Sequence, residues 1–265
     1  MTDDFLPKSS YNIDDLVSIM SRLRAPGGCP WDAEQTHESI KKNLIEETYE
    51  VIEAINKGDS ALLLEELGDL LLQVVFHARL EEETGRFSFD DVCDGICKKL
   101  IERHPHVFGD IIVDSVGDVL ANWDSIKRRS KGQKKGSETM LSVPRELPAL
   151  MRASKVQQRA ARLGFDWPDV SGASEKLSEE QGELLDAVAS GDKDLCAEEL
   201  GDLLFSAVNV SRFVGCDAEE ALTGATDKFI ARFQKLERLA KERGIDLEKS
   251  SLAEMDKLWD EIKHK

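Results

Sequence analysis

The sequence predicts an all-α protein built from two copies of one helical unit. Three observations lead to this prediction. Apolar residues recur at helical spacing, alternating strand patterns are nearly absent, and the heptapeptide EELGDLL at 65–71 returns at 198–204. Aromatic residues make up only 6% of the chain, and its glycines and prolines are scattered, which favours helices over sandwiches or barrels.

The duplication extends well beyond this heptapeptide. Residues 46–79 align with 179–212 without a gap, and about half of the aligned pairs are identical. Paired landmarks keep the same order around the two copies: GGCPWD (27–32) and GFDWPD (164–169), KLIER (99–103) and KFIAR (228–232), WDSIK (123–127) and WDEIK (259–263). We therefore predict an N-terminal domain at 1–129, a Lys-, Gly- and Ser-rich linker at 130–143, and a C-terminal domain at 144–265.

Each copy contains a predicted αα-hairpin. In NKGDS (56–60) and ASGDK (189–193), a glycine is placed to end the first helix and an aspartate to cap the second. In the helix of the first copy that follows, apolar residues recur at i, i+3, i+4 and i+7, and Leu72 and Phe76 widen the stripe. This pattern predicts a core-facing stripe composed of Leu67, Leu70, Leu71, Val74, Val75 and Ala78.

Charge excludes some partners. The formal net charge of −17 repels phosphate backbones, so nucleic acids and anionic membranes are poor candidates. A small anionic substrate can still bind where a divalent cation or a local basic cluster reverses the field. The five cysteines form no C-x-x-C pair and read as small buried residues, and neither a signal pattern nor a long apolar run is present. We expect a cytoplasmic protein.

Acidic residues line one face of each predicted hairpin. The first helix carries Glu46, Glu47, Glu50 and Glu53 within an arc of about 120°, and Glu66 and Asp69 share one edge of the second, with Gln73 and His77 continuing it. The second copy offers the equivalent set Glu180, Glu183, Glu199 and Asp202, with Glu179 and Asp186 beside it.

Carboxylates brought so close together repel one another unless a cation lies between them. An all-oxygen donor set suits Mg²⁺ or Mn²⁺ with positions left open for water and phosphate oxygens. A solvated face is the alternative explanation, but Asp69 and Asp202 lie inside apolar runs and the pattern occurs twice. A di-iron centre would need Glu-x-x-His motifs, and no clustered glutamate of either copy has a His three residues after it.

Basic and aromatic residues also recur. Lys99 and Arg103 form an i, i+4 pair, as do Lys228 and Arg232, and each pair is suited to clamping phosphate oxygens. Trp123 and Trp259 stand near the ends of the two copies. A tryptophan there can stack on a base, although covering a core is the commoner role.

EETYE…EELGD (46–69) and EEQGE…EELGD (179–202) resemble the E-E-x-x-E…E-x-x-D pattern of the MazG family, the all-α nucleoside triphosphate pyrophosphohydrolases. GGCPWD, ERHPHVF (102–108), PALMRASKVQ (148–157) and GFDW are similar to its tandem, two-domain members. The resemblance implies Mg²⁺-dependent hydrolysis of nucleoside triphosphates to the monophosphate and pyrophosphate, in nucleotide-pool clean-up, by homodimers whose helical bundles are completed across subunits.

The resemblance also implies site residues. The metal ligands correspond to Glu180, Glu183, Glu199 and Asp202, with the second set Glu47, Glu50, Glu66 and Asp69. Lys228 and Arg232 match triphosphate-contacting positions and Trp259 a nucleotide-contacting one, with counterparts Lys99, Arg103 and Trp123. Activity in tandem members is usually associated with the C-terminal copy, where Glu179, Glu180 and Glu183 are the expected catalytic acids and Glu179 the candidate for activating water.

Two other functions remain open at this point. The acids of one or both copies can serve a non-catalytic nucleotide- or metal-sensing module. The enzyme can also be specific for one nucleotide, such as dUTP. One departure from the family pattern is Gly182, which lies in the middle of a predicted helix at a cost of about 1 kcal/mol relative to Ala.

Overall fold

The computed structural model describes residues 7–111 and 136–263, and residues 115, 117, 119 and 126 between them. Every regular element in this part of the chain is a helix, which confirms the all-α prediction. The chain divides into two compact units, Met1–Lys127 and Arg128–Lys265. None of the described helices is both long and apolar enough to cross a membrane.

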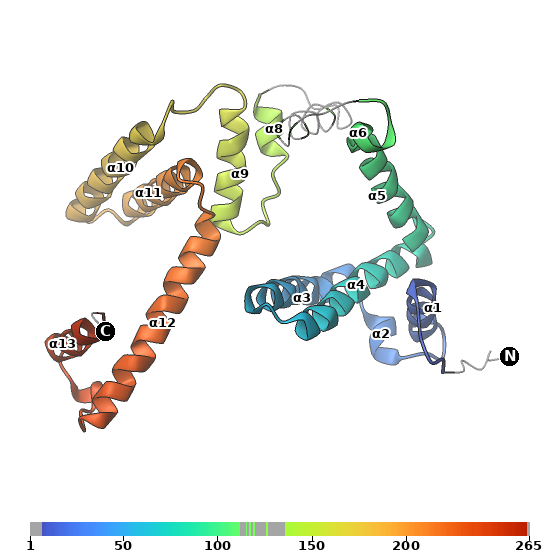
Figure 1. Cartoon of the computed structure of the whole chain (residues 1–265), viewed down its shortest axis with the longest axis horizontal. Coiled ribbons are helices and arrows are strands. Elements are labelled where there is room, and N and C mark those ends of the chain that lie inside the picture. Colours follow the sequence, from blue (N-terminus) through green and yellow to red (C-terminus); the bar gives the residue numbers. More distant parts are fainter. Residues whose placement is uncertain are drawn as a thin grey trace. The chain divides into compact units, whose positions relative to one another are not determined.

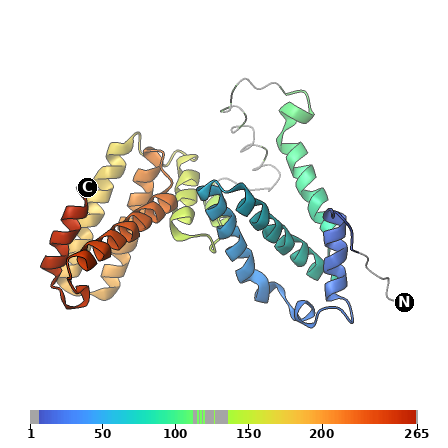
Figure 2. The same cartoon turned by 60° about the horizontal axis from the view of Figure 1, so that its bottom comes forward.

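Unit 1 is organised around the hairpin of its two long helices, α3 and α4, which lie side by side (Figures 1 and 2). Helix α1 packs against α4, and α5 follows α4. The helices are α1 (Ile13–Arg24), α2 (Pro30–Glu34), α3 (His37–Lys57), α4 (Ser60–Glu83), α5 (Phe89–Arg103) and α6 (Pro105–Phe108).

Unit 2 repeats the hairpin as α10 and α11, and its long helix α12 runs from α9 to α13 (Figure 1). Residues 136–143 of the segment predicted as a linker include the short helix α8, which contacts α9. The helices are α8 (Ser137–Leu141), α9 (Ala149–Ala161), α10 (Val170–Ser190), α11 (Lys193–Phe213), α12 (Ala218–Glu242), the 3₁₀ turn η1 (Leu247–Lys249) and α13 (Leu252–Lys263).

The turn that joins the two helices has the predicted chemistry in both hairpins. Gly58 ends α3 at φ 64° and Gly191 ends α10 at φ 75°, in the left-handed region that favours glycine. The side chain of Asp59 accepts hydrogen bonds from the first backbone N–H groups of α4, and Asp192 does the same for α11. These caps fix where each second helix begins.

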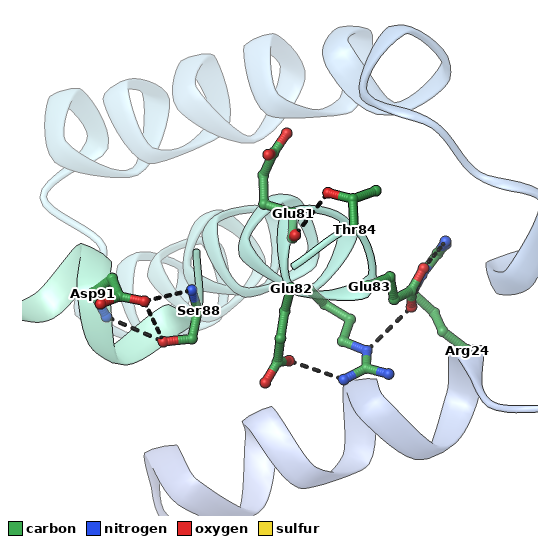
Figure 3. Close-up of polar contacts among 8 residues, drawn as sticks. Arg24, Glu81, Glu82, Glu83, Thr84, Ser88 and Asp91 are labelled. Atoms are coloured by element: carbon green, nitrogen blue, oxygen red, sulfur yellow. Dashed lines mark hydrogen bonds and ion pairs between the residues drawn. The ribbon is translucent and has the colours of Figure 1, made fainter. Parts of the chain in front are cut away.

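Arg24 holds α1 against the C-terminal end of α4. Its guanidinium donates two hydrogen bonds of 2.9 Å to the two carboxylate oxygens of Glu83 (Figure 3). The same side chain also donates to the backbone carbonyls of Asp32 and Gln35, so it fixes the loop before α3 as well. Because the Arg24 side chain is only 5% exposed, this fork is a structural contact rather than a surface pair.

Two predictions about burial are wrong in part. Val75 and Ala78 of α4 are buried as expected, but Leu67, Leu71 and Val74 are 48%, 40% and 38% exposed. The reason is that α3 and α1 cover other faces of α4, where Phe76 is buried in a small core with Met20. None of the five cysteines is buried, although all are unpaired as expected.

Candidate metal centre

Three carboxylates from two helices converge in each unit. In unit 2, ligand oxygens of Glu180, Glu199 and Asp202 all lie within 4.8 Å of one another. In unit 1 the same holds for Glu47, Glu66 and Asp69. The acids come together because the Gly-Asp turn places the acidic edge of the second helix against that of the first.

The fourth acid of each set lies beside its cluster. The carboxyl group of Glu180 lies near enough to that of Glu183 to raise the pKa of Glu183, and Glu50 and Glu47 are neighbours in the same way. All four acids predicted for each unit therefore gather at one place on its hairpin. Helix α10 continues unbroken through Gly182, so this glycine does not disturb the arrangement.

The electrostatics of both clusters favour a bound cation. Burial, and then the neighbouring carboxylate of Glu180, raises the pKa of Glu183. Burial and the charge of Glu180 likewise raise the pKa of Glu199. In unit 1, burial is again the larger cause, and the pKa values of Glu47 and Glu66 are raised with help from Asp69 and Glu50 respectively. Each cluster thus carries more negative charge than it accommodates alone.

An all-carboxylate donor set of this kind fits a hard divalent cation. Mg²⁺ and Mn²⁺ prefer oxygen ligands and keep several coordination positions for water or phosphate. The Glu180 carboxylate, whose residue is only 5% exposed, would be the best-shielded donor of its set.

The sequence reasoning missed Lys176. Its ammonium nitrogen lies 2.6 Å from Glu180 Oε1 and 2.8 Å from Glu179 Oε1. Hydrogen bonds to Glu179 and then Glu180 raise the pKa of this lysine, so it stays charged. Its spacing three and four residues before the two acids is the signal that could have found it. The equivalent residue in unit 1 is the uncharged Asn43.

Glu179 lies at the edge of the cluster rather than in it. Its side chain is 57% exposed and is held by Lys176. Among the residues described, only Glu180, Glu199 and Asp202 form the close group in this unit. The sequence equivalent in unit 1 is Glu46, which lies outside the close group there as well.

The structure does not bring the predicted phosphate-binding residues to the acids of the same chain. Lys228 and Arg232 belong to α12, which packs chiefly against α13. In the described part of the chain no ion pair joins either residue to the carboxylates. Lys99 and Arg103 lie on α5, which follows the C-terminal end of α4 after the short connection at 84–88. The clustered acids of α4 lie in its N-terminal half.

Trp259 supports a core. It is half-buried against Leu236 and Leu258, and its ring centroid is 5.2 Å from that of Phe229, with the two rings tilted. Covering a core is the commoner of the two roles that the sequence predicts for this tryptophan. Trp123, its counterpart, lies outside the described residues.

These features define a class of protein: an all-α chain with a duplicated carboxylate centre on a helical hairpin. A family model, the MazG nucleotide pyrophosphohydrolase domain, matches residues 35–108 and 171–237, and so includes both hairpins. The chain belongs to the MazG family.

Two relatives resemble the chain over almost their whole length. The nucleoside triphosphate pyrophosphohydrolase/pyrophosphatase MazG of Thermotoga maritima is 48% identical over 250 residues, which cover 94% of this chain and 95% of the relative. The nucleoside triphosphate pyrophosphohydrolase of Escherichia coli (strain K12) is 45% identical over 254 residues, which cover 95% of this chain and 97% of the relative.

Proposed function

We propose that this chain is a cytoplasmic, Mg²⁺-dependent nucleoside triphosphate pyrophosphohydrolase that acts in nucleotide-pool clean-up. It converts a nucleoside triphosphate and water to the monophosphate and pyrophosphate. The observation that carries the proposal is the convergence of Glu180, Glu199 and Asp202 within 4.8 Å, with Glu183 beside them. The names of the two relatives supply the reaction.

We assign the following roles in unit 2. Glu180, Glu183, Glu199 and Asp202 would hold Mg²⁺, which when bound neutralises phosphate charge. Water adds to the α-phosphorus, the bond from that phosphorus to the α–β bridging oxygen breaks, and pyrophosphate leaves. Glu179 accepts the proton of the attacking water. Lys228 and Arg232 bind the departing pyrophosphate, and Trp259 contacts the nucleotide.

Unit 1 carries a complete equivalent set, Glu47, Glu50, Glu66 and Asp69, with Lys99, Arg103 and Trp123 as its proposed substrate contacts. We propose that catalysis takes place in unit 2. Lys176 supports this choice, because a fixed cation beside the acids is present in unit 2 and absent at Asn43 of unit 1.

We further propose that the active form is a homodimer. Leu67 and Leu71 of α4 are 48% and 40% exposed, and their equivalents on α11, Leu200 and Leu204, are both 47% exposed. The same apolar edge of the acidic hairpin is therefore uncovered in both units. A second copy of the chain carries the same two edges, so it is the partner that can cover both of them. In a dimer, Lys228 and Arg232 would also be able to approach the carboxylates of the second copy, whereas they do not reach the carboxylates of their own chain.

The reaction is tested by measuring pyrophosphate release from a panel of nucleoside triphosphates with Mg²⁺, with monophosphate and diphosphate products separated. Wild type is compared with Glu50→Gln, Glu183→Gln and the double variant, after circular dichroism confirms folding. We expect wild type to form monophosphate and pyrophosphate. The rate of pyrophosphate release should fall by a factor of about 100 or more in Glu183→Gln and should be retained in Glu50→Gln.

Other outcomes redirect the proposal. Loss in Glu50→Gln alone would move catalysis to unit 1. Normal turnover by Glu183→Gln would refute the ligand assignment. If wild type binds nucleotides but hydrolyses none of them, the chain is a sensing module and the enzymatic proposal fails.

A further inference from the structure

The loop at 164–168, which joins α9 to α10 (Figure 1), is anchored to α11 and displays a tryptophan. Arg212 of α11 donates a hydrogen bond of 2.6 Å to Asp166 Oδ2, and it is itself braced by Asn209 at 2.7 Å. The next residue, Trp167, is nevertheless 45% exposed. An aromatic ring of this size that stays open on a fixed loop offers a surface to a ligand.

The indole of Trp167 lies against the first turns of α10 at Gly172. A Cβ atom at position 172 would come within 2.6 Å of Cε3 and 2.8 Å of Cδ2 of the indole. The ring therefore rests directly on the helix backbone, and any residue other than glycine would displace it. One face of the ring is fixed in this way, while much of the side chain remains accessible.

Gly172 lies on the same face of α10 as the acidic site. Lys176, Glu180 and Glu183 follow it by four, eight and eleven residues, which at 100° per residue spans an arc of about 80°. Lys176 is about 6 Å and Glu183 about 16 Å further along the helix axis. An aromatic ring, a cation and the carboxylates thus follow one another along a single helix face.

Unit 1 lacks this arrangement. The residue equivalent to Gly172 is Ser39, whose hydroxyl donates to Gln35 Oε1 at 2.8 Å and accepts from the Thr36 N–H at 2.9 Å. A side chain fills the position where the indole rests in unit 2. Lys176 is replaced by Asn43, and Trp31, which lies in the short helix α2 before α3, has no glycine at position 39 to lie on.

We propose that Trp167 is the surface on which the base of the bound nucleotide stacks in unit 2. This inference rests on the proposed function. With its phosphates at the carboxylates, an extended nucleoside triphosphate lying along this face of α10 would direct its base toward the indole. Stacking accepts any base, because every base has a π-face. Trp259 has its ring packed against Phe229 and the core, whereas Trp167 is 45% exposed.

The test measures equilibrium binding to the full chain by calorimetry, with Mg²⁺, of two ligands: an α,β-methylene nucleoside triphosphate, and inorganic tripolyphosphate, which has no base. We expect Trp167→Leu to weaken nucleotide binding about tenfold and to leave tripolyphosphate binding unchanged. Trp167→Phe should retain most of the affinity. Gly172→Ser should behave like Trp167→Leu, because its side chain displaces the indole. Trp31→Leu is the matched control and should change neither affinity.

Unchanged nucleotide affinity in Trp167→Leu would overturn the inference. Equal weakening of both ligands would also overturn it, because the loop would then act on the site as a whole. A loss in Trp31→Leu as large as that in Trp167→Leu would overturn the role given to the Gly172 contact. Hydrolysis is assayed separately, so absence of turnover with base-dependent binding intact would refute the proposed reaction and support the stacking role.

Discussion

The ammonium nitrogen of Lys176 lies 2.6 Å from a carboxylate oxygen of Glu180, the acid of the unit 2 cluster that is almost fully buried. A buried carboxylate without a partner is costly, so this lysine supplies the positive charge that the site requires before a metal arrives. A divalent cation at the cluster would take over that role and release the lysine for other contacts.

Replacing Lys176 by Met should therefore lower the Tm of the metal-free protein at neutral pH. Mg²⁺ should then raise the Tm of this variant more than that of wild type, because the ion restores the missing charge. Differential scanning calorimetry in EDTA and in Mg²⁺ measures both effects. Lys235→Met, an exposed lysine of α12, is the control and should match wild type. An unchanged metal-free Tm in Lys176→Met would contradict the stabilising role.

The stabilisation by Mg²⁺ should depend on pH. The pKa values of Glu183 and Glu199 are raised in the folded state, first by burial and then by Glu180. A carboxyl group with a raised pKa stabilises the fold below its unfolded pKa, and this contribution is lost as the pH rises through the folded value. The carboxylates of the metal-free cluster should thus contribute more stability in mild acid, whereas Mg²⁺ should raise the Tm more at about pH 7.5 than at about pH 5.

Thermal unfolding at the two pH values, with and without Mg²⁺, checks this expectation. The Glu50→Gln, Glu183→Gln double variant is the control, because it carries fewer charges to neutralise. Its Mg²⁺ increment should be smaller at both pH values. Equal increments for wild type at both pH values would show that the acids do not bind the ion.

A histidine pair should make unit 1 sensitive to acid. Nδ1 of His37 lies 2.7 Å from Nδ1 of His77, and Nε2 of His37 lies 2.7 Å from Glu81, which also pairs with Arg86. Burial, and then the charge of His37, lowers the pKa of His77. The contribution of His77 to stability is fully present when the pH is above the ordinary histidine pKa of about 6.5. It is lost as the pH falls through the lowered pKa of the folded state.

His77→Val, which introduces the residue found at Val210 in unit 2, should remove this dependence. Hydrogen exchange followed by mass spectrometry on peptides from α3 and α4 gives a local readout. Between about pH 7 and pH 5, and after correction for intrinsic rates, protection should fall in wild type and stay nearly level in the variant. Peptides from α10 and α11 serve as the internal control. Parallel loss in wild type and variant would rule out the histidine pair as the cause.

A charge on the uncovered apolar edges should separate the proposed dimer. Leu71→Glu and Leu204→Glu each place a carboxylate on such an edge. A buried charge without a partner costs at least about 3 kcal/mol, roughly a hundredfold in dissociation constant. Light scattering should therefore report monomers for the variants at concentrations where wild type is dimeric. Leu141→Glu, on α8, is the control, and dimers that survive both edge substitutions would place the interface elsewhere.

Local chemistry was predictable from the sequence. Helical spacing, together with a glycine followed by an aspartate, was enough to predict both hairpins and their turns, because each depends on residues close together in the chain. The same spacing predicted which acids share a face. Lys176 belongs to this local category too, because it lies three and four residues before Glu179 and Glu180.

Tertiary arrangement was harder to predict. Periodicity shows that Leu67 and Leu71 share a face of α4, but it does not show whether another helix of the same chain covers that face. The distance of Lys228 from the acids depends on the direction that α12 takes after α11. The contact of Trp167 with Gly172 depends on the path of a loop, for which the sequence has no periodic signal.

The turn at Gly191 and Asp192 has a consequence for how such a chain can change over time. Two acids of the cluster precede it and two follow it, so it sets the rotational phase between them. A single residue inserted or deleted in α11 between this turn and Glu199 would turn the acids of α11 by about 100° relative to the turn and move them by about 1.5 Å along the helix axis. Substitutions around this point leave the rotational phase of the acids unchanged, whereas a change of length does not, and the two duplicated halves still align there without a gap.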